Sequence, residues 1–127
     1  MRAIVYAAAV IGLVAPMAAQ AMTVETFLAK TNALKKKGLF AIGSSDIGLL
    51  KTEMQGVTEG YRAEVAAARA AGRTPPSCPP AKGSAGARLS AGEFLADLER
   101  IPAAQARTMS MKTAFYAMMK RRFPCPA

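Results

Sequence analysis

The sequence predicts an all-α protein: a small bundle of four to five helices with one disulfide, preceded by a cleavable signal peptide. Apolar residues recur at intervals of three or four over several segments, which is the helical period. No segment shows the alternation of a half-buried strand. Two cysteines, Cys78 and Cys125, follow an apolar N-terminal segment. We therefore expect one helical domain at residues 22–127 behind a signal at 1–21.

Residues 1–21 have the features of a secretory signal in the usual order. Arg2 precedes an apolar run at 3–14, and the tripeptide at 19–21 has the small-x-small pattern of a cleavage site. The run is shorter than the roughly 20 apolar residues of a membrane span; an uncleaved anchor is the alternative. We expect cleavage after Ala21, a periplasmic or secreted product, and no transmembrane segment in the mature chain.

The mature chain is basic. The full chain has 17 Lys and Arg against 8 Asp and Glu, and only Arg2 leaves with the signal, so the net charge falls from +9 to +8. In an exported protein such a charge favours an acidic protein, anionic lipid or peptidoglycan carboxylates over nucleic acid. Solubility alone is the other interpretation.

The first mature helix is expected over residues 23–37. Thr23 caps it, Gly38 ends it, and one face is apolar. That face is formed by Val24, Phe27, Leu28 and Leu34. The apolar run at 39–42 is either one helical turn or an extended link packed on the core. Ser45 or Asp46 is the expected cap of the next helix.

The longest periodic segment predicts a helix over residues 47–71, ended by Gly72. Its apolar stripe is formed by Ile47, Leu50, Met54, Val57, Tyr61, Val65 and Ala68. Gly56 and Gly60 lie one turn apart, next to Tyr61. They either allow another helix or a partner chain to approach closely, or mark a bend or break near Gly56.

Residues 73–89 form a loop rich in proline and glycine, and Cys78 lies within it. Export and an even cysteine count favour an intramolecular Cys78–Cys125 bond over free thiols or an intermolecular bond. A disulfide that closes the chain between Cys78 and Cys125 stabilises a fold by about 4 kcal/mol on the chain-entropy model. The bond would hold a loop suited to binding, whose second half at 81–88 is either ordered or disordered.

Two further helices and a short turn complete the pattern. Ser90 and Glu93 form a capping box before a helix that Pro102 ends. A helical turn is expected over 102–107, and Thr108 or Ser110 begins the last helix. The apolar face of that helix is formed by Met111, Phe115, Met118 and Met119, with Phe123 at its end.

No group of residues predicts catalysis. The chain has no histidine, so a transition-metal site and the commonest general base are absent. Met109, Met111, Met118 and Met119 crowd one helix. Copper(I) would need a second sulfur one turn after Met111, where Phe115 stands, so core packing is favoured. We expect no enzymatic activity and no cofactor.

Basic residues form the candidate partner surface. It comprises Lys35, Lys36, Lys37, Arg73, Lys82, Arg88, Lys120, Arg121 and Arg122. Two of its runs end helices, where cations complement the helix dipole without any partner. If those two helix ends lay together, they would form one positive patch for an acidic partner.

Three short motifs now stand in a recognisable order: residues 56–61 (GVTEGY), Cys78-Pro79-Pro80, and Phe123-Pro124-Cys125. This pattern resembles the small periplasmic immunity proteins of the Rap/Tai type, which protect bacteria from amidase toxins of type VI secretion. The resemblance covers about residues 49–125. It implies a helical bundle that blocks an effector's active-site cleft, is often dimeric, and has a disulfide corresponding to Cys78–Cys125.

The leading hypothesis is therefore an exported protein-binding module, in its narrower form an inhibitor of a cell-wall amidase. A second hypothesis is a small periplasmic stress chaperone with a helical, disulfide-held fold. A third is a basic structural protein that binds the envelope by charge, and its binding should weaken with salt.

Overall fold

The computed structural model describes residues 21–80 and 89–126, and this part of the chain confirms the all-α fold. Five α-helices and one 3₁₀ turn succeed one another, and the described residues form no strand. The elements are α1 (Val24–Lys37), η1 (Gly38–Ala41), α2 (Ser45–Ala70), α3 (Ala91–Glu99), α4 (Ala103–Ala106) and α5 (Met111–Arg122). The predicted signal up to residue 20 and the loop at 81–88 lie outside the described residues. No described helix has the length and apolarity needed to cross a membrane.

Each long helix begins at a hydroxyl side chain that accepts a backbone hydrogen bond from its first turn. The caps are Thr23, Ser44, Ser90 and Ser110. The predicted capping box of Ser90 and Glu93 is present in both directions. The prediction of Ser45 or Asp46 as the cap of α2 is wrong. The Ser44 side chain accepts from the Asp46 amide, so the helix begins one residue earlier.

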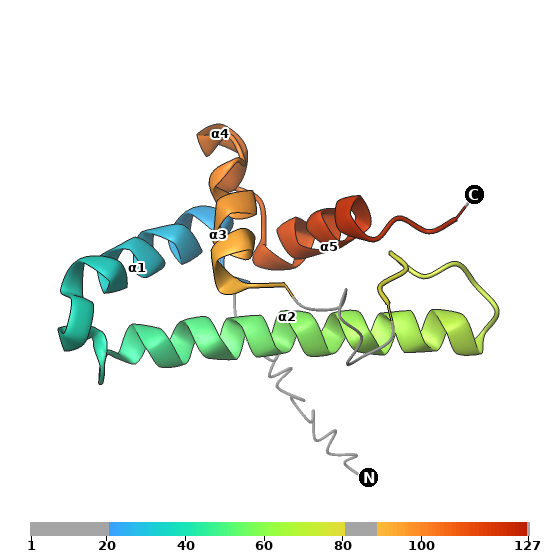
Figure 1. Ribbon diagram of the computed structural model, residues 1–127, viewed down its shortest axis with the longest axis horizontal. Coiled ribbons are helices and arrows are strands. Elements are labelled where there is room, and N and C mark those ends of the chain that lie inside the picture. The colour runs from blue at the N-terminus through green and yellow to red at the C-terminus, as the bar shows by residue number, and fades with distance from the viewer. Residues whose placement is uncertain (1–20, 81–88, 127) are drawn as a thin grey trace, which may run out of the picture.

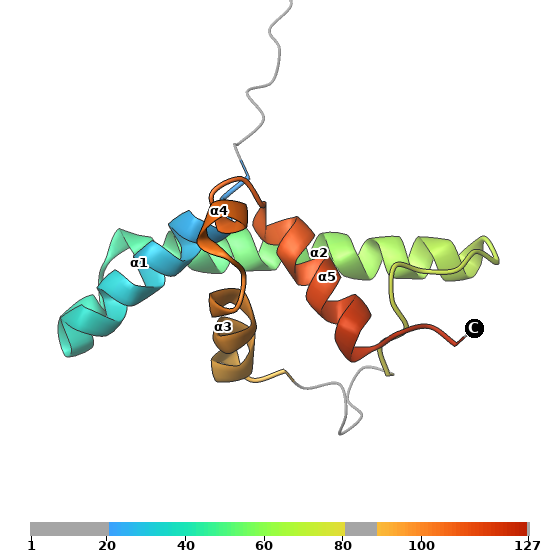
Figure 2. The same cartoon turned by 90° about the horizontal axis from the view of Figure 1, so that it is seen from above.

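Helix α2 runs unbroken for 26 residues and supports the rest of the molecule (Figure 1). Gly72, with φ of 68°, ends it, and the Arg73 amide donates to the Ala68 carbonyl oxygen at 2.8 Å. The predicted apolar stripe is fully buried only from Val57 onward, whereas Ile47 is 42% exposed. The C-terminal half of α2 is the half that α5 covers in both views (Figures 1 and 2).

Within this chain, no described helix packs closely against Gly56 and Gly60, although their spacing suggested such packing. A Cβ atom added at either position would meet nothing within 4 Å, and α2 does not break there. Tyr61 is the residue of this trio that packs, and it is 4% exposed. Among the described residues, no helix approaches α2 through the two glycines.

Aromatic rings join the four longest elements of the core. Phe27 of α1 contacts Phe94 of α3 edge to face, with ring centroids 6.1 Å apart. Phe94 contacts Phe115 of α5 at 6.3 Å, and Phe115 contacts Tyr61 of α2 at 5.4 Å. Such edge-to-face pairs stabilise a core beyond the area that they bury. Helices α1 and α5 thus lie over the same side of α2, and α3 packs against α1 (Figure 2).

A short backbone bridge ties the start of α1 to the start of α5. The Val24 amide donates to the Met109 carbonyl and the Met111 amide to the Met22 carbonyl, both at 2.9 Å. These bonds surround an isolated antiparallel pair, Thr23 and Ser110, which are also the caps of the two helices. The bridge therefore determines where both helices begin.

The apolar run at 39–42 forms a helical turn, but it does not pack on the core. Leu39, Phe40 and Ile42 are 85%, 88% and 80% exposed. Gly38 and Gly43, with φ of 57° and 100°, stand on either side of the turn and direct the chain around the end of the α1–α2 pair. Of the two alternatives for this run, the helical turn is present and the extended link packed on the core is not.

Leu98 and Leu39 form a matched pair for testing the core. Leu98→Ala removes a side chain that is 2% exposed, so we expect the free energy of unfolding to fall by about 2–5 kcal/mol. Leu39→Ala makes the same change at an exposed site and should alter it by no more than about 0.5 kcal/mol. Urea denaturation followed by circular dichroism measures both. Equal losses would contradict this assignment of core and surface.

Candidate functional site

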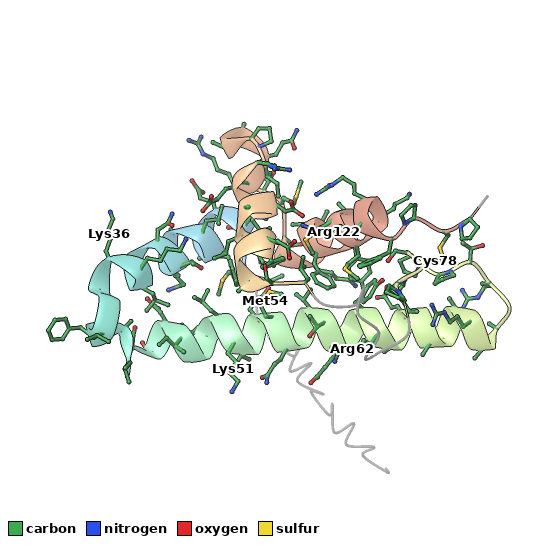
Figure 3. The ribbon with its side chains drawn as sticks, viewed as in Figure 1. Lys36, Lys51, Met54, Arg62, Cys78 and Arg122 are labelled. Carbon is green, nitrogen blue, oxygen red and sulfur yellow. A yellow bond between two sulfur atoms is a disulfide. The ribbon has the colours of Figure 1, made fainter. Side chains whose placement is uncertain are left out.

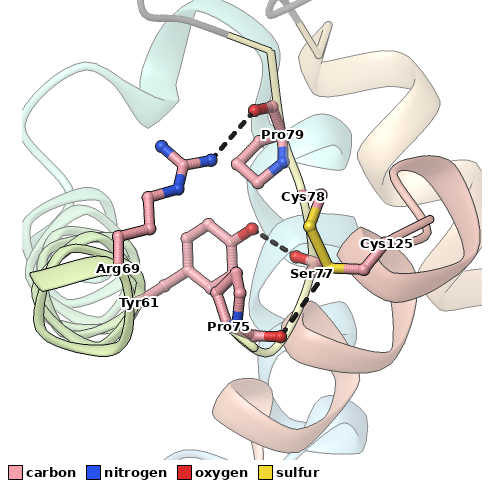
Figure 4. The surroundings of a disulfide bond; sticks show 7 residues. All are labelled: Tyr61, Arg69, Pro75, Ser77, Cys78, Pro79 and Cys125. Atoms are coloured by element: carbon pink, nitrogen blue, oxygen red, sulfur yellow. Dashed lines mark hydrogen bonds between the residues drawn. A yellow bond between two sulfur atoms is a disulfide. The ribbon is translucent and has the colours of Figure 1, made fainter. Parts of the chain in front are cut away.

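The predicted disulfide joins Cys78 of the proline-rich loop to Cys125 behind α5, with Cα atoms 4.8 Å apart (Figure 4). A backbone hydrogen bond reinforces it, from the Cys78 amide to the Phe123 carbonyl at 2.8 Å. The loop that follows α2 is therefore attached to the end of α5, as the sequence predicted. We call residues 73–80 the stapled loop.

Two side chains of α2 hold the stapled loop from its other side. The Tyr61 hydroxyl and the Ser77 hydroxyl share a hydrogen bond, and Ser77 is buried. The Arg69 guanidinium donates to the Pro79 carbonyl at 3.5 Å (Figure 4). A buried serine that lacked its partner would cost free energy, so the Tyr61 bond positions the loop. No sequence pattern indicated the Tyr61–Ser77 pair, because the two residues belong to elements of different kinds.

The described members of the predicted basic surface at this end are Arg73, Lys120, Arg121 and Arg122. Arg73 closes the C-terminus of α2, and the other three form the last turn of α5, directly before the disulfide. Arg122 is not free: its guanidinium donates twice to one Asp97 oxygen, at 3.0 and 3.1 Å. Arg73, Lys120 and Arg121 are exposed and make no ion pair with another described residue. We call these three residues the basic end.

Lys35, Lys36 and Lys37 lie at the opposite end of the molecule. Lys36 and Cys78 mark the two ends in Figure 3, and Figures 1 and 2 agree in separating the end of α1 from the end of α5. The two basic runs therefore do not form one patch. Lys82 and Arg88, the remaining members of the predicted surface, lie outside the described residues.

An open cleft of about 290 Å³ lies beside the basic end. Arg121 lines it from α5, Arg100 and Asp97 from the end of α3, and Gln105 from α4. Asp97 is occupied by Arg122 and, at 3.9 Å, by Arg100. The exposed guanidinium of Arg121 is thus the group in this cleft suited to an incoming carboxylate.

A second open groove, of about 300 Å³, lies between α2 and α5. Gly56 and Gly60 form part of its wall, with Tyr116 and Lys112 opposite, and Ala21 at the predicted cleavage site also lines it. Lys112 forms an ion pair with Glu64 at 3.2 Å and lies 5.4 Å from the Tyr116 ring centroid. The glycines therefore border an open surface.

Burial raises the pKa of Tyr116 to about 12, and the neighbouring Glu64 carboxylate adds to the shift. The Tyr116 hydroxyl is buried and meets no partner at hydrogen-bond geometry in the described part of the chain. Burial is therefore the largest cause of the raised pKa, and the interaction with Glu64 is the second. The Tyr116 hydroxyl and Lys112 in turn lower the pKa of Glu64.

Residues 21–80 and 89–126 contain no cluster of three potential ligands among Cys, Asp and Glu. Met111, Met118 and Met119 are buried in the core, as predicted for packing.

We compared the chain with protein families, curated proteins and solved structures. No family model, no curated protein and no solved structure matches this chain.

Replacing both cysteines tests the staple. Cys78→Ser with Cys125→Ser should lower the free energy of unfolding by about 4 kcal/mol, because the unfolded chain regains the freedom of the 47-residue separation. Thr74→Ser, an exposed change in the same loop, is the control. A loss below about 1 kcal/mol in urea denaturation would show that the staple contributes little.

Tyr116 should titrate well above an ordinary tyrosine. Its folded pKa exceeds the usual value of about 10, so its contribution to stability is present below about pH 10 and is lost as pH rises toward 12. Phenolate absorbance of the mature chain, with Tyr116→Phe subtracted, measures this group. Glu64→Gln should lower its midpoint but leave it above 10, since burial is the larger cause. A midpoint at 10 in the folded protein would contradict this account.

Proposed function

We propose that the mature chain is an exported protein-binding module and that the basic end binds an acidic surface of its partner. The observation that carries the proposal is the attachment of the stapled loop. A disulfide and the bonds from Tyr61 and Arg69 hold a mostly half-buried, proline-rich segment next to the cations of α5. Binding through a segment that is already ordered costs little further conformational entropy.

Charge supports an acidic partner. Arg73, Lys120 and Arg121 are exposed beside the stapled loop, and the mature chain has a net charge of +8 once Arg2 is removed. A positive surface of this kind raises the rate of association with a negative one and disfavours basic partners. Arg121 in its cleft suits a carboxylate side chain of that partner.

The narrower proposal is inhibition of a cell-wall amidase. It rests on the resemblance to Rap/Tai-type immunity proteins at residues 56–61, 78–80 and 123–125. Two of those three motifs, Cys78-Pro79-Pro80 and Phe123-Pro124-Cys125, surround the disulfide beside the basic end. A homodimer, which the resemblance also implies, remains part of this narrower proposal.

Charge reversal at the two ends of the molecule tests the proposal. Tagged mature chain is incubated with periplasmic proteins and, separately, with an amidase toxin whose hydrolysis of peptidoglycan is measured. Arg73→Glu, Lys120→Glu and Arg121→Glu together should weaken binding by about a hundredfold, since like charges then oppose one another. Lys35→Glu, Lys36→Glu and Lys37→Glu change the net charge equally at the far end and should bind normally.

Four outcomes are decisive. Stoichiometric capture of an acidic protein that depends on the basic end supports the module, and loss of amidase activity supports the narrower role. Equal weakening by both triple variants would show that only net charge matters. Failure to capture any protein in either arm would overturn the proposal.

A further inference from the structure

The exposed large apolar side chains of the described residues belong to one short stretch of the chain. There are five of them, and all lie between residues 39 and 49, where α1 passes into α2. They are Leu39, Phe40, Ile42, Ile47 and Leu49. Scattered exposed apolar residues are ordinary, whereas a contiguous group marks an interaction site. We call this group the apolar tip.

The backbone presents the apolar tip outward. Gly38, the first residue of η1, and Gly43, two residues after its end, adopt positive φ, so the turn projects beyond the ends of both helices (Figure 1). An ion pair behind the tip, Lys30 Nζ to Asp46 Oδ1 at 2.9 Å, holds α1 and α2 together. The tip is therefore a protrusion on a fixed support, and neither open cleft of the described structure reaches it.

Cations precede and follow the apolar tip in the sequence, and few carboxylates accompany them. Lys35, Lys36 and Lys37 precede it, and Lys51 follows Leu49 by two residues. Asp46 is the one carboxylate between residues 26 and 52, and Lys30 occupies it. None of the four lysines forms an ion pair with a described residue.

The geometry points to an anionic lipid bilayer as the occupant: the apolar tip enters the headgroup region while the lysines bind lipid phosphates. An apolar protrusion next to lysines combines the two forces that bring peripheral proteins to membranes. Lysine stems extend along apolar surface and keep the ammonium at the interface. A fluid bilayer receives a convex tip without a preformed pocket, whereas a protein partner would need a matching cavity with an acidic rim.

This inference goes beyond the proposed function and uses the other end of the molecule. The apolar tip and the stapled loop lie at opposite ends of α2 (Figures 1 and 3). A chain held to a membrane by its tip would therefore present the basic end away from the lipid. Either activity can fail without the other, because they share no residue.

Vesicle flotation of the mature chain tests the inference. We expect binding to vesicles of phosphatidylglycerol and phosphatidylcholine in equal parts, little binding to phosphatidylcholine alone, and weakening between about 10 and 150 mM salt. Phe40→Ser should weaken binding by about tenfold or more, and Phe40→Leu should largely retain it. Lys36→Gln with Lys37→Gln should weaken binding by about 25-fold, at about fivefold per lysine. The matched pair at the far end, Lys120→Gln with Arg121→Gln, should change it by less than about twofold.

The variants alter exposed residues, so unchanged circular dichroism and melting confirm their folding. Absence of binding to anionic vesicles overturns the inference. An equal loss of binding from the two double variants also overturns it, because binding would then depend on the net charge of the protein and not on the tip. Self-association that Phe40→Ser abolishes, without vesicle binding, would assign the tip to a second copy of the chain. If the tip bound a protein but not vesicles, its occupant would be a protein pocket. Either this result or tip-dependent self-association without vesicle binding would reject the proposal of a lipid bilayer.

Discussion

The structure depends on Tyr61. Its ring packs against Phe115 and Tyr116 of α5, each at 5.4 Å between centroids, and its hydroxyl bonds the buried Ser77 of the stapled loop. One side chain of α2 thus holds both the helix above it and the loop beyond it. A phenylalanine would keep the ring contacts and leave the serine hydroxyl buried without its partner. Core packing and the candidate binding surface therefore meet at the same residue.

Helix α2 separates two ends of different character. At its C-terminal end, α5, the disulfide and the stapled loop bury the stripe from Val57 to Ala68 and leave Arg73 and Arg121 at the surface. At its N-terminal end α1 is the main described helix that packs on α2, and Ile47 and Leu49 stay partly in water. The first end is rigid and charged, and the second is apolar with a basic flank. A small core cannot cover a 26-residue helix along its whole length, so the N-terminal part of α2 remains exposed to solvent.

The sequence predicts the ends of helices well where contacts within one helical turn decide them. The caps at Thr23, Ser90 and Ser110, and the glycine stop at Gly72, depend on bonds within one turn, so their residues suffice to predict them. The Ser44 cap was missed because adjacent serines offer the same hydroxyl, and only the backbone conformation distinguishes them. Apolar periodicity identified which face of α2 is buried, but not how far along the helix its cover extends.

The sequence by itself determined the helices, most of their ends and the pairing of the two cysteines, because short-range hydrogen bonding, apolar period and cysteine count are all carried in the order of residues. Only the tertiary structure decided which charged groups are free. It paired Arg122 with Asp97 and Lys30 with Asp46, and it placed Lys36 and Arg121 at opposite ends. It also left the run at 39–42 in water, since burial depends on which helices cross above a segment, and a local pattern cannot record that.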